Sequence, residues 1–190
     1  MADLSVASPV QSSRQLQRLF WIFLILNIVY ILWSKNFLQP LESRDIISFE
    51  IAKKVPVAES IIQEWTIPDD VKLNKAIQAI YLDYLFIILY TTGLTVACVY
   101  LSGLTRHQIL KRAARFIQFL LLGAGVCDII ENIAMTNSLN GHLNQWNVSL
   151  AYDMAVTKFS IIILSLIFIV ICLFFYLLRD KQANPSLSEP

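Results

Sequence analysis

Four long apolar runs constrain the fold of this 190-residue chain more than any other feature of its sequence. They cover approximately residues 19–35, 77–104, 113–135 and 156–178. A run of about 20 apolar residues is long enough to cross a bilayer as a helix. Because backbone groups in lipid need hydrogen-bond partners within the chain, we expect all four runs to be helical. The sequence therefore predicts an all-α fold, a four-helix transmembrane bundle that forms a single membrane domain.

The distribution of basic residues predicts how these spans are oriented. The segment between the second and third spans carries four basic residues and no acid: Arg106, Lys111, Arg112 and Arg115. The segment between the third and fourth spans has neither lysine nor arginine. Lysine and arginine in short connections are retained on the cytoplasmic side. We therefore expect a multi-pass protein of the cell membrane whose N-terminus and C-terminus are both cytoplasmic.

The connection between the first two spans, residues 36–76, is the longest region outside the predicted spans. Apolar residues at helical spacing follow Pro56 in this region: Val57, Ile61 and Trp65. This pattern, with a proline in the first turn, predicts a helix. We therefore expect a helical outer loop over 36–76, whereas the short polar tails, residues 1–13 and 180–190, are expected to be disordered.

Composition also limits the classes of partner. The apolar fraction of 56% indicates that membrane lipids surround most of the chain. A net charge of +1 provides no basic face, so we predict no nucleic-acid partner. The cysteines Cys98, Cys127 and Cys172 all lie in apolar runs without CxxC spacing, and we predict neither a disulfide, a metal site nor a cofactor. A second copy of the chain, or another membrane protein, remains open as a partner.

Polar side chains within the predicted spans form the candidate site: Asp83, Asp128, Glu131, Asn132 and Lys158. At a helix rise of about 1.5 Å per residue, all of them lie within roughly 10 Å of the outer boundary, and Asn27 in the first span lies at the same depth. Asp128, Glu131 and Asn132 are spaced i, i+3, i+4 and share one helix face. Because an ionised group facing lipid is costly, this face should point into the bundle or into a wet cavity.

The charges in this predicted cluster do not balance, because three acids accompany a single lysine. Either at least one carboxyl group is protonated, or a cation, a ligand or a residue of the outer loop supplies the difference. Glu50, Trp65 and His142 are candidates for a lid or rim over the cluster.

Three interpretations of the cluster remain open. It can fix helix packing in a structural or scaffold protein. It can bind, or act on, a small amphiphile or lipid. In that case an acid is the proton-transfer group, Lys158 adjusts the pKa of that acid, and Asn132 orients the ligand. It can conduct protons or cations, although the inner halves of the spans offer few polar residues for a path. The sequence does not decide whether the protein is an enzyme.

Four stretches carry a resemblance to known proteins: ISFEIAKKVPVAESIIQEW, YLDYLFIILY, DIIEN and TKF. Together they resemble small uncharacterised bacterial membrane proteins with four spans. The resemblance covers residues 19–178. It implies a four-helix membrane fold with a structured first outer loop, and it implies no activity.

Overall fold

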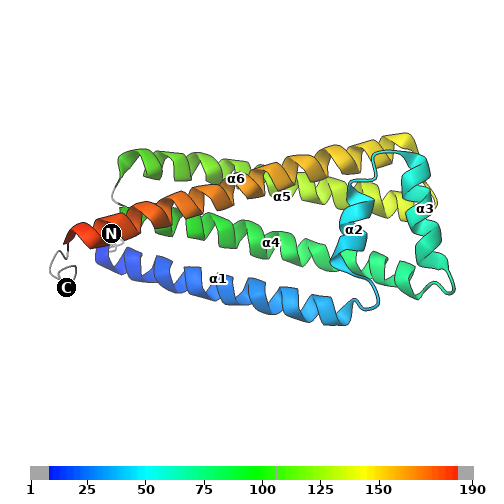
Figure 1. Ribbon diagram of the computed structural model, residues 1–190, viewed down its shortest axis with the longest axis horizontal. Coiled ribbons are helices and arrows are strands. Elements are labelled where there is room, and N and C mark those ends of the chain that lie inside the picture. Colours follow the sequence, from blue (N-terminus) through cyan, green and yellow to red (C-terminus); the bar gives the residue numbers. More distant parts are fainter. Residues whose placement is uncertain (1–8, 106, 184–190) are drawn as a thin grey trace, which may run out of the picture.

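The computed structural model describes residues 9–105 and 107–183, which form six helices and no strand (Figure 1). The helices are α1 (Pro9–Phe37), α2 (Ser43–Glu50), α3 (Val55–Thr66), α4 (Val71–Thr105), α5 (Gln108–Leu139) and α6 (Gln145–Ala183). The predicted all-α fold is confirmed.

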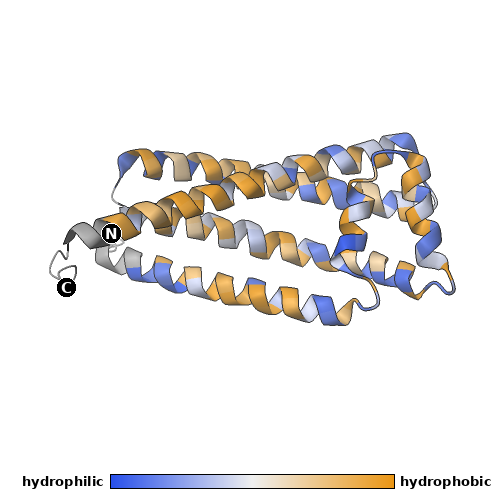
Figure 2. Ribbon diagram, viewed as in Figure 1, coloured by the Kyte–Doolittle hydropathy of each residue, from blue (hydrophilic) through white to orange (hydrophobic). Residues whose placement is uncertain are grey.

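Four of these helices, α1, α4, α5 and α6, run along the length of the bundle, and α2 and α3 lie across one end of it (Figure 1). We call this end the loop end, and the opposite end, where α1 begins and α6 ends, the terminal end. All four long helices are long and apolar enough to cross a membrane. Apolar residues dominate their middle portions (Figure 2). The chain is therefore built as a multi-pass membrane protein.

The long helices extend beyond the apolar runs that predicted them. At the loop end, α4 begins at Val71 and α6 at Gln145, because helical hydrogen bonding continues where these helices pack against α2 and α3 outside the apolar layer. At the terminal end, α1 begins at Pro9 and α6 continues to Ala183, so both helices reach into segments that the sequence predicted to be disordered. An established helix propagates readily into flanking polar residues. The remainder of the predicted tails, 1–8 and 184–190, lies outside the described residues.

Helix α1 lies at the edge of the bundle and packs mainly against α4. Asn27 donates a hydrogen bond of 3.1 Å to the carbonyl oxygen of Leu89, and Tyr30 donates one of 2.8 Å to that of Leu82. Gly93 permits this close approach, because a Cβ atom there would lie 2.9 Å from Nδ2 of Asn27. No residue in the apolar stretch of α1 is fully buried, so the rest of its surface is left to lipid.

The outer loop is helical because its sequence carries two helix starts. The side chain of Asp45 accepts a hydrogen bond of 2.9 Å from the backbone N–H of Glu42, which stabilises the first turn of α2. Pro56 lies in the first turn of α3, where a missing N–H costs nothing. Lys72 at the start of α4 then lies 3.2 Å from both Asp45 and Glu64 and links the two short helices.

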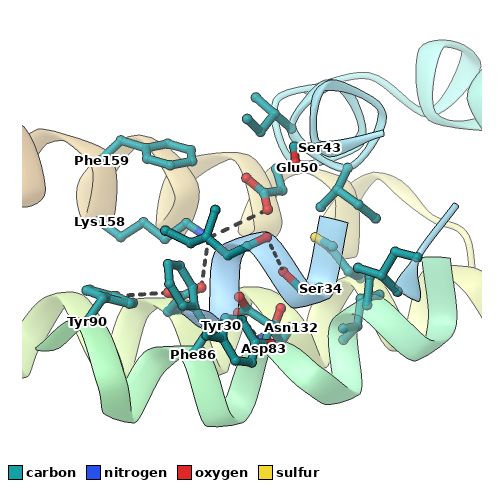
Figure 3. Close-up of a pocket in the computed structure, with 18 of the residues that line it drawn as sticks. Tyr30, Ser34, Ser43, Glu50, Asp83, Phe86, Tyr90, Asn132, Lys158 and Phe159 are labelled. Carbon is teal, nitrogen blue, oxygen red and sulfur yellow. Dashed lines mark hydrogen bonds and ion pairs between the residues drawn. The ribbon is translucent and has the colours of Figure 1, made fainter. Parts of the chain in front are cut away.

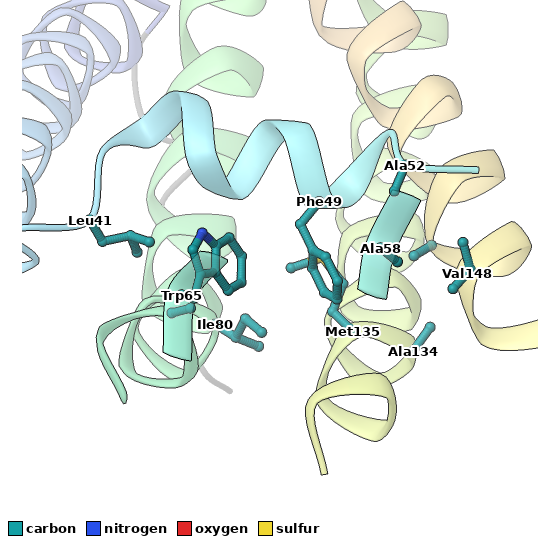
Figure 4. Packing of buried hydrophobic residues seen from close by; sticks show 11 residues of the cluster. Leu41, Phe49, Ala52, Ala58, Trp65, Ile80, Ala134, Met135 and Val148 are labelled. Carbon is teal, nitrogen blue, oxygen red and sulfur yellow. The ribbon is translucent and has the colours of Figure 1, made fainter. Parts of the chain in front are cut away.

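A hydrophobic cluster fixes α2 and α3 to the loop end (Figure 4). Trp65 is its largest member and is only 1% exposed, and its ring lies 5.3 Å from that of Phe49. The cluster spans α2 to α6 through residues that include Leu41, Ala58, Ile80, Met135 and Val148. The helical character of the outer loop is confirmed, and the structure shows in addition that the loop is a packed cap over the loop end.

Candidate functional site

A cavity of about 290 Å³ lies beneath α2 at the loop end, and we call it the loop-end cavity (Figure 3). Five helices contribute to its wall: α1, α2, α4, α5 and α6. Its polar side chains include Glu50, Asp83, Tyr90, Asp128, Asn132 and Lys158. Four of the five predicted cluster residues therefore line one cavity, and Glu131 lies directly behind it in contact with Lys158.

Lys158 is the centre of the buried charges. Its Nζ lies 2.7 Å from Oδ1 of Asp128 and 2.9 Å from each carboxyl oxygen of Glu131, to whose Oε1 it donates a hydrogen bond. A third acid, Glu50, places Oε1 3.7 Å from the same Nζ. Lys158 is 5% exposed and Glu131 0%. Three acids from α2 and α5 thus share one ammonium group from α6.

A second set of contacts joins α4 to α5. Asn132 donates a hydrogen bond of 2.8 Å to Oδ2 of Asp83, and Tyr90 donates one of 2.9 Å to Oδ2 of Asp128. Asp128 therefore has one oxygen bound by Lys158 and the other bound by Tyr90. The i, i+3, i+4 face of α5 points into the bundle, as its spacing predicted.

Glu50 is the contribution of the outer loop to the cluster. It ends α2, is 7% exposed, and lines the loop-end cavity. Its Oε2 has no hydrogen-bond partner among the described residues. Burial raises the pKa of Glu50 above its ordinary value, an effect that the Lys158 charge opposes and the Asp128 charge reinforces. The outer loop therefore adds a fourth acid to the cluster and not a base that would balance it.

The other predicted rim residues lie elsewhere. Trp65 is buried in the hydrophobic cluster behind Phe49 and does not line the cavity. His142 is exposed in the connection between α5 and α6 and does not line it either; its carbonyl oxygen accepts a hydrogen bond from Asn147. Asn27, predicted at the same depth, binds the backbone of α4 instead of joining the cluster.

One side of the cavity is apolar and open. Its lining there includes the exposed side chains of Ile31 on α1 and Ile47 on α2, together with the half-buried Phe159 and Ile162 on α6. These residues lie on the lipid-facing surface of membrane-spanning helices or directly above it. The cavity thus has a polar end inside the bundle and an apolar mouth between α1 and α6.

Sequence reasoning missed Tyr30, Phe86 and Phe159, which belong to the aromatic wall of the cavity. The rings of Tyr30 and Phe86 are stacked with centroids 5.3 Å apart, and Phe86 lies 5.4 Å from Tyr90. Phe159 lies across from them on α6 (Figure 3). Tyr30 and Phe86 have apolar sequence neighbours, so no periodic signal separated these two aromatic residues from those that face lipid.

No group of three His, Cys, Asp or Glu side chains suited to a metal ion occurs in the part of the chain that the structure describes. The position between the carboxyl groups is taken by the ammonium group of Lys158. In comparisons with known proteins, no family model, curated protein or solved structure matches this chain. The resemblance to small four-span bacterial membrane proteins therefore stays a prediction.

Proposed function

We propose that this multi-pass membrane protein binds a small amphiphile or a lipid in the loop-end cavity. The polar head group occupies the end lined by Glu50, Asp83 and Asp128, and the apolar chain leaves through the mouth between α1 and α6. The observation that carries this proposal is the combination of a polar end and an apolar opening in one cavity at membrane depth. Such an arrangement matches both halves of an amphiphile.

A purely structural role for the whole cluster is the second interpretation. Lys158, Asp128 and Glu131 do connect α5 to α6, and these contacts stabilise the bundle. A cluster that only fixed packing would be closed and fully paired. The cavity of about 290 Å³ and the unpaired oxygen of Glu50 favour a binding site built on top of this structural ion pair.

Passage of protons or cations has less support. A path would have to continue from the polar end of the cavity to the terminal end of the bundle. The interior there is filled by an apolar cluster in which Cys98, Leu121 and Cys172 are fully buried. Nothing in the described interior favours such a path over a closed site.

The orientation of the site follows from the positive-inside rule. The connection between α4 and α5 is rich in basic residues that include Lys111, Arg112 and Arg115, which supports a cytoplasmic location for the terminal end. With this orientation the loop end faces outward. The mouth of the cavity then opens to the outer leaflet of the cell membrane.

Analysis of co-purifying lipids tests the binding function. Wild-type protein and two variants are purified in a mild non-ionic detergent, and bound compounds are identified by mass spectrometry. Ala79→Phe places a ring in the cavity, because Ala79 is a small lining residue on α4. Leu85→Phe on the same helix is the control, since Leu85 is exposed to lipid. Both variants are first checked for an unchanged circular dichroism spectrum.

We expect a specific compound to accompany the wild-type protein and Leu85→Phe, and to be lost from Ala79→Phe. The reason is that the added ring fills the space that the ligand needs. An identical set of bound compounds in all three proteins would contradict the proposal.

A further inference from the structure

The polar end of the loop-end cavity is acidic. Four carboxyl groups line it or lie directly behind it: Glu50, Asp83, Asp128 and Glu131. Among the residues that line the cavity, Lys158 is the single basic side chain. Its ammonium group is already bound to Asp128 and Glu131. A head group that enters this site therefore meets several carboxyl groups and no free base.

Three of the hydrogen-bond donors at this end are already bound within the protein. Tyr90 donates to Asp128, Asn132 to Asp83, and Tyr30 to the backbone of α4. Two buried carboxylate oxygens have no hydrogen-bond partner among the described residues, Oε2 of Glu50 and Oε2 of Glu131. The Glu131 oxygen lies 2.9 Å from Nζ of Lys158, so the acceptor left for a ligand in the cavity is Oε2 of Glu50, on a side chain more than nine-tenths buried. A buried acceptor without a donor costs free energy that a ligand recovers by donating a hydrogen bond. Oε2 of Glu50 is thus available to a ligand that donates a hydrogen bond, and a charged donor would bind it most strongly.

The aromatic wall is suited to the same kind of group. The faces of aromatic rings attract cations, most strongly where water is excluded. Tyr30 and Phe86 form a stacked pair beside the acids. Lys158 already illustrates this mode of binding within the protein, because its Nζ contacts two carboxyl groups and lies 5.0 Å from the centre of the Phe159 ring.

We infer that the head group bound in the loop-end cavity is an ammonium group. This inference rests on the proposed function and specifies its ligand class. The ammonium group donates to Oε2 of Glu50 and lies beside the rings of Tyr30 and Phe86. It can belong to a single-chain amine or to the ethanolamine head of a phospholipid, since both present the same N–H donors and positive charge. A head group bearing only phosphate or carboxylate would instead face four acids.

The size of the cavity agrees with this ligand class. A volume of about 290 Å³ is near the lower end of the range for small-molecule pockets. It accommodates a compact head group and the start of a chain, and the remainder of the chain lies in the mouth beside Ile31 and Ile162.

Four probes distinguish the head groups and their sources. Dodecylamine, dodecanol and dodecyl phosphate share one chain and differ only in the head group, and phosphatidylethanolamine represents a phospholipid source. Each is added to purified full-length protein in non-ionic detergent, and bound probe is quantified by native mass spectrometry. Glu50→Gln removes the charge and keeps the shape. Glu59→Gln is its control, because Glu59 is an exposed acid of the same outer loop.

We expect dodecylamine or phosphatidylethanolamine to bind at least about tenfold more tightly than dodecanol and dodecyl phosphate, the effect of one charge-assisted hydrogen bond. Tighter binding of dodecylamine would identify a single-chain amine as the ligand, and tighter binding of phosphatidylethanolamine would identify a phospholipid. Glu50→Gln should abolish the preference and Glu59→Gln should keep it. Asp83→Asn, a second cavity acid, replaces Glu50→Gln if that variant does not fold.

Two results would overturn the inference. The first rejects only the ammonium class, and the second also rejects the proposed binding site. If dodecanol or dodecyl phosphate binds as tightly as dodecylamine, and Ala79→Phe removes this binding, the ammonium class is wrong and the amphiphile site remains. If Ala79→Phe affects the binding of none of the four probes, both the ammonium class and the proposed site are wrong.

Discussion

Lys158 on α6 and Asp128 on α5 form an ion pair of 2.7 Å in which both side chains are almost completely buried, at 5% and 2% exposed. A buried charged group is tolerated where its partner of opposite charge is close and its remaining hydrogen-bond donors or acceptors are satisfied. Here Glu131 and Tyr90 provide those further contacts. The pair therefore has a structural role in joining two spans, whatever the adjacent cavity binds.

Replacing the lysine tests this structural role. Lys158→Met leaves the surrounding acids without a counter-charge, and we expect the free energy of unfolding to fall by about 3–5 kcal/mol. Thermal or denaturant unfolding of the purified protein in detergent measures the change. Lys54→Met, at an exposed lysine of the outer loop, should leave stability nearly unchanged.

The double variant Lys158→Met with Asp128→Asn should recover part of that loss, because it removes one of the unpaired charges together with the lysine. A double variant whose loss equals the sum of the two single losses would show that the two side chains are not coupled.

Raising the pH should loosen α2. Burial raises the pKa of Glu50 above its ordinary value of 4.5, against the opposing effect of Lys158, while Asp128 adds to the rise and Glu131 also contacts Glu50. The folded protein then holds this proton more tightly than the unfolded chain does, so the contribution to stability is present at low pH and is lost as pH rises through the raised pKa.

Hydrogen exchange of Ser43–Glu50, corrected for intrinsic rates and compared at acidic and alkaline pH, measures this effect. Exchange of α2 should rise with pH in the wild-type protein and much less in Glu50→Gln. Equal pH dependence in both proteins would assign the effect to other groups.

Two glycines of α4 form a matched pair for testing how α1 is held. Gly93→Ala places a Cβ atom 2.9 Å from Nδ2 of Asn27, so Asn27 must move and its hydrogen bond to Leu89 is lost. We expect a loss of about 1 kcal/mol of stability. Gly103→Ala meets no atom within 4 Å and should cause no loss. Thermal unfolding compares the two, and equal effects would argue against the described packing of α1.

Two tryptophans at the loop end differ sharply in exposure, at 1% for Trp65 and 76% for Trp146. Trp65→Ala removes the largest side chain of the hydrophobic cluster, and we expect a loss of about 3–5 kcal/mol. Faster proteolysis within the outer loop should accompany this loss, because α2 and α3 depend on Trp65. Trp146→Ala should resemble the wild-type protein in both measurements.

Cysteine labelling in intact cells tests the proposed orientation. Glu59 in α3 and Gln108 at the start of α5 are both exposed and lie at opposite ends of the bundle. A membrane-impermeant thiol reagent should modify Glu59→Cys in intact cells, and Gln108→Cys only after permeabilisation. The reverse pattern would place the loop end in the cytoplasm. The unmodified chain, with Cys98, Cys127 and Cys172, provides the background signal.

The membrane fold followed from the sequence because a long apolar run has few alternatives to a spanning helix. The inward face of α5 was predictable for a similar reason, since Asp128, Glu131 and Asn132 repeat at the period of a helix. Local spacing was sufficient in both cases. No information about distant parts of the chain was needed.

From the sequence, Glu50 could be proposed only as a rim residue over the polar cluster, because its position depends on tertiary packing. Its carboxyl group reaches Lys158 since Phe49 and Trp65 fix α2 over the bundle, and those contacts join segments far apart in the sequence. Tyr30 and Phe86 were missed because apolar residues flank both of them in the sequence. The cavity itself arises from the spacing of five helices, which no single segment specifies.

Because α1 is held from one side, the thickness of the surrounding bilayer acts directly on the cavity wall. A spanning helix accommodates a mismatch in thickness by tilting, and α1 has fewer protein contacts to resist that tilt than α4, α5 or α6. Tilting would carry Ile31 toward or away from Phe159 across the mouth. We therefore expect the width of the entrance, and with it the size of chain that the proposed site admits, to depend on the lipid composition around the protein.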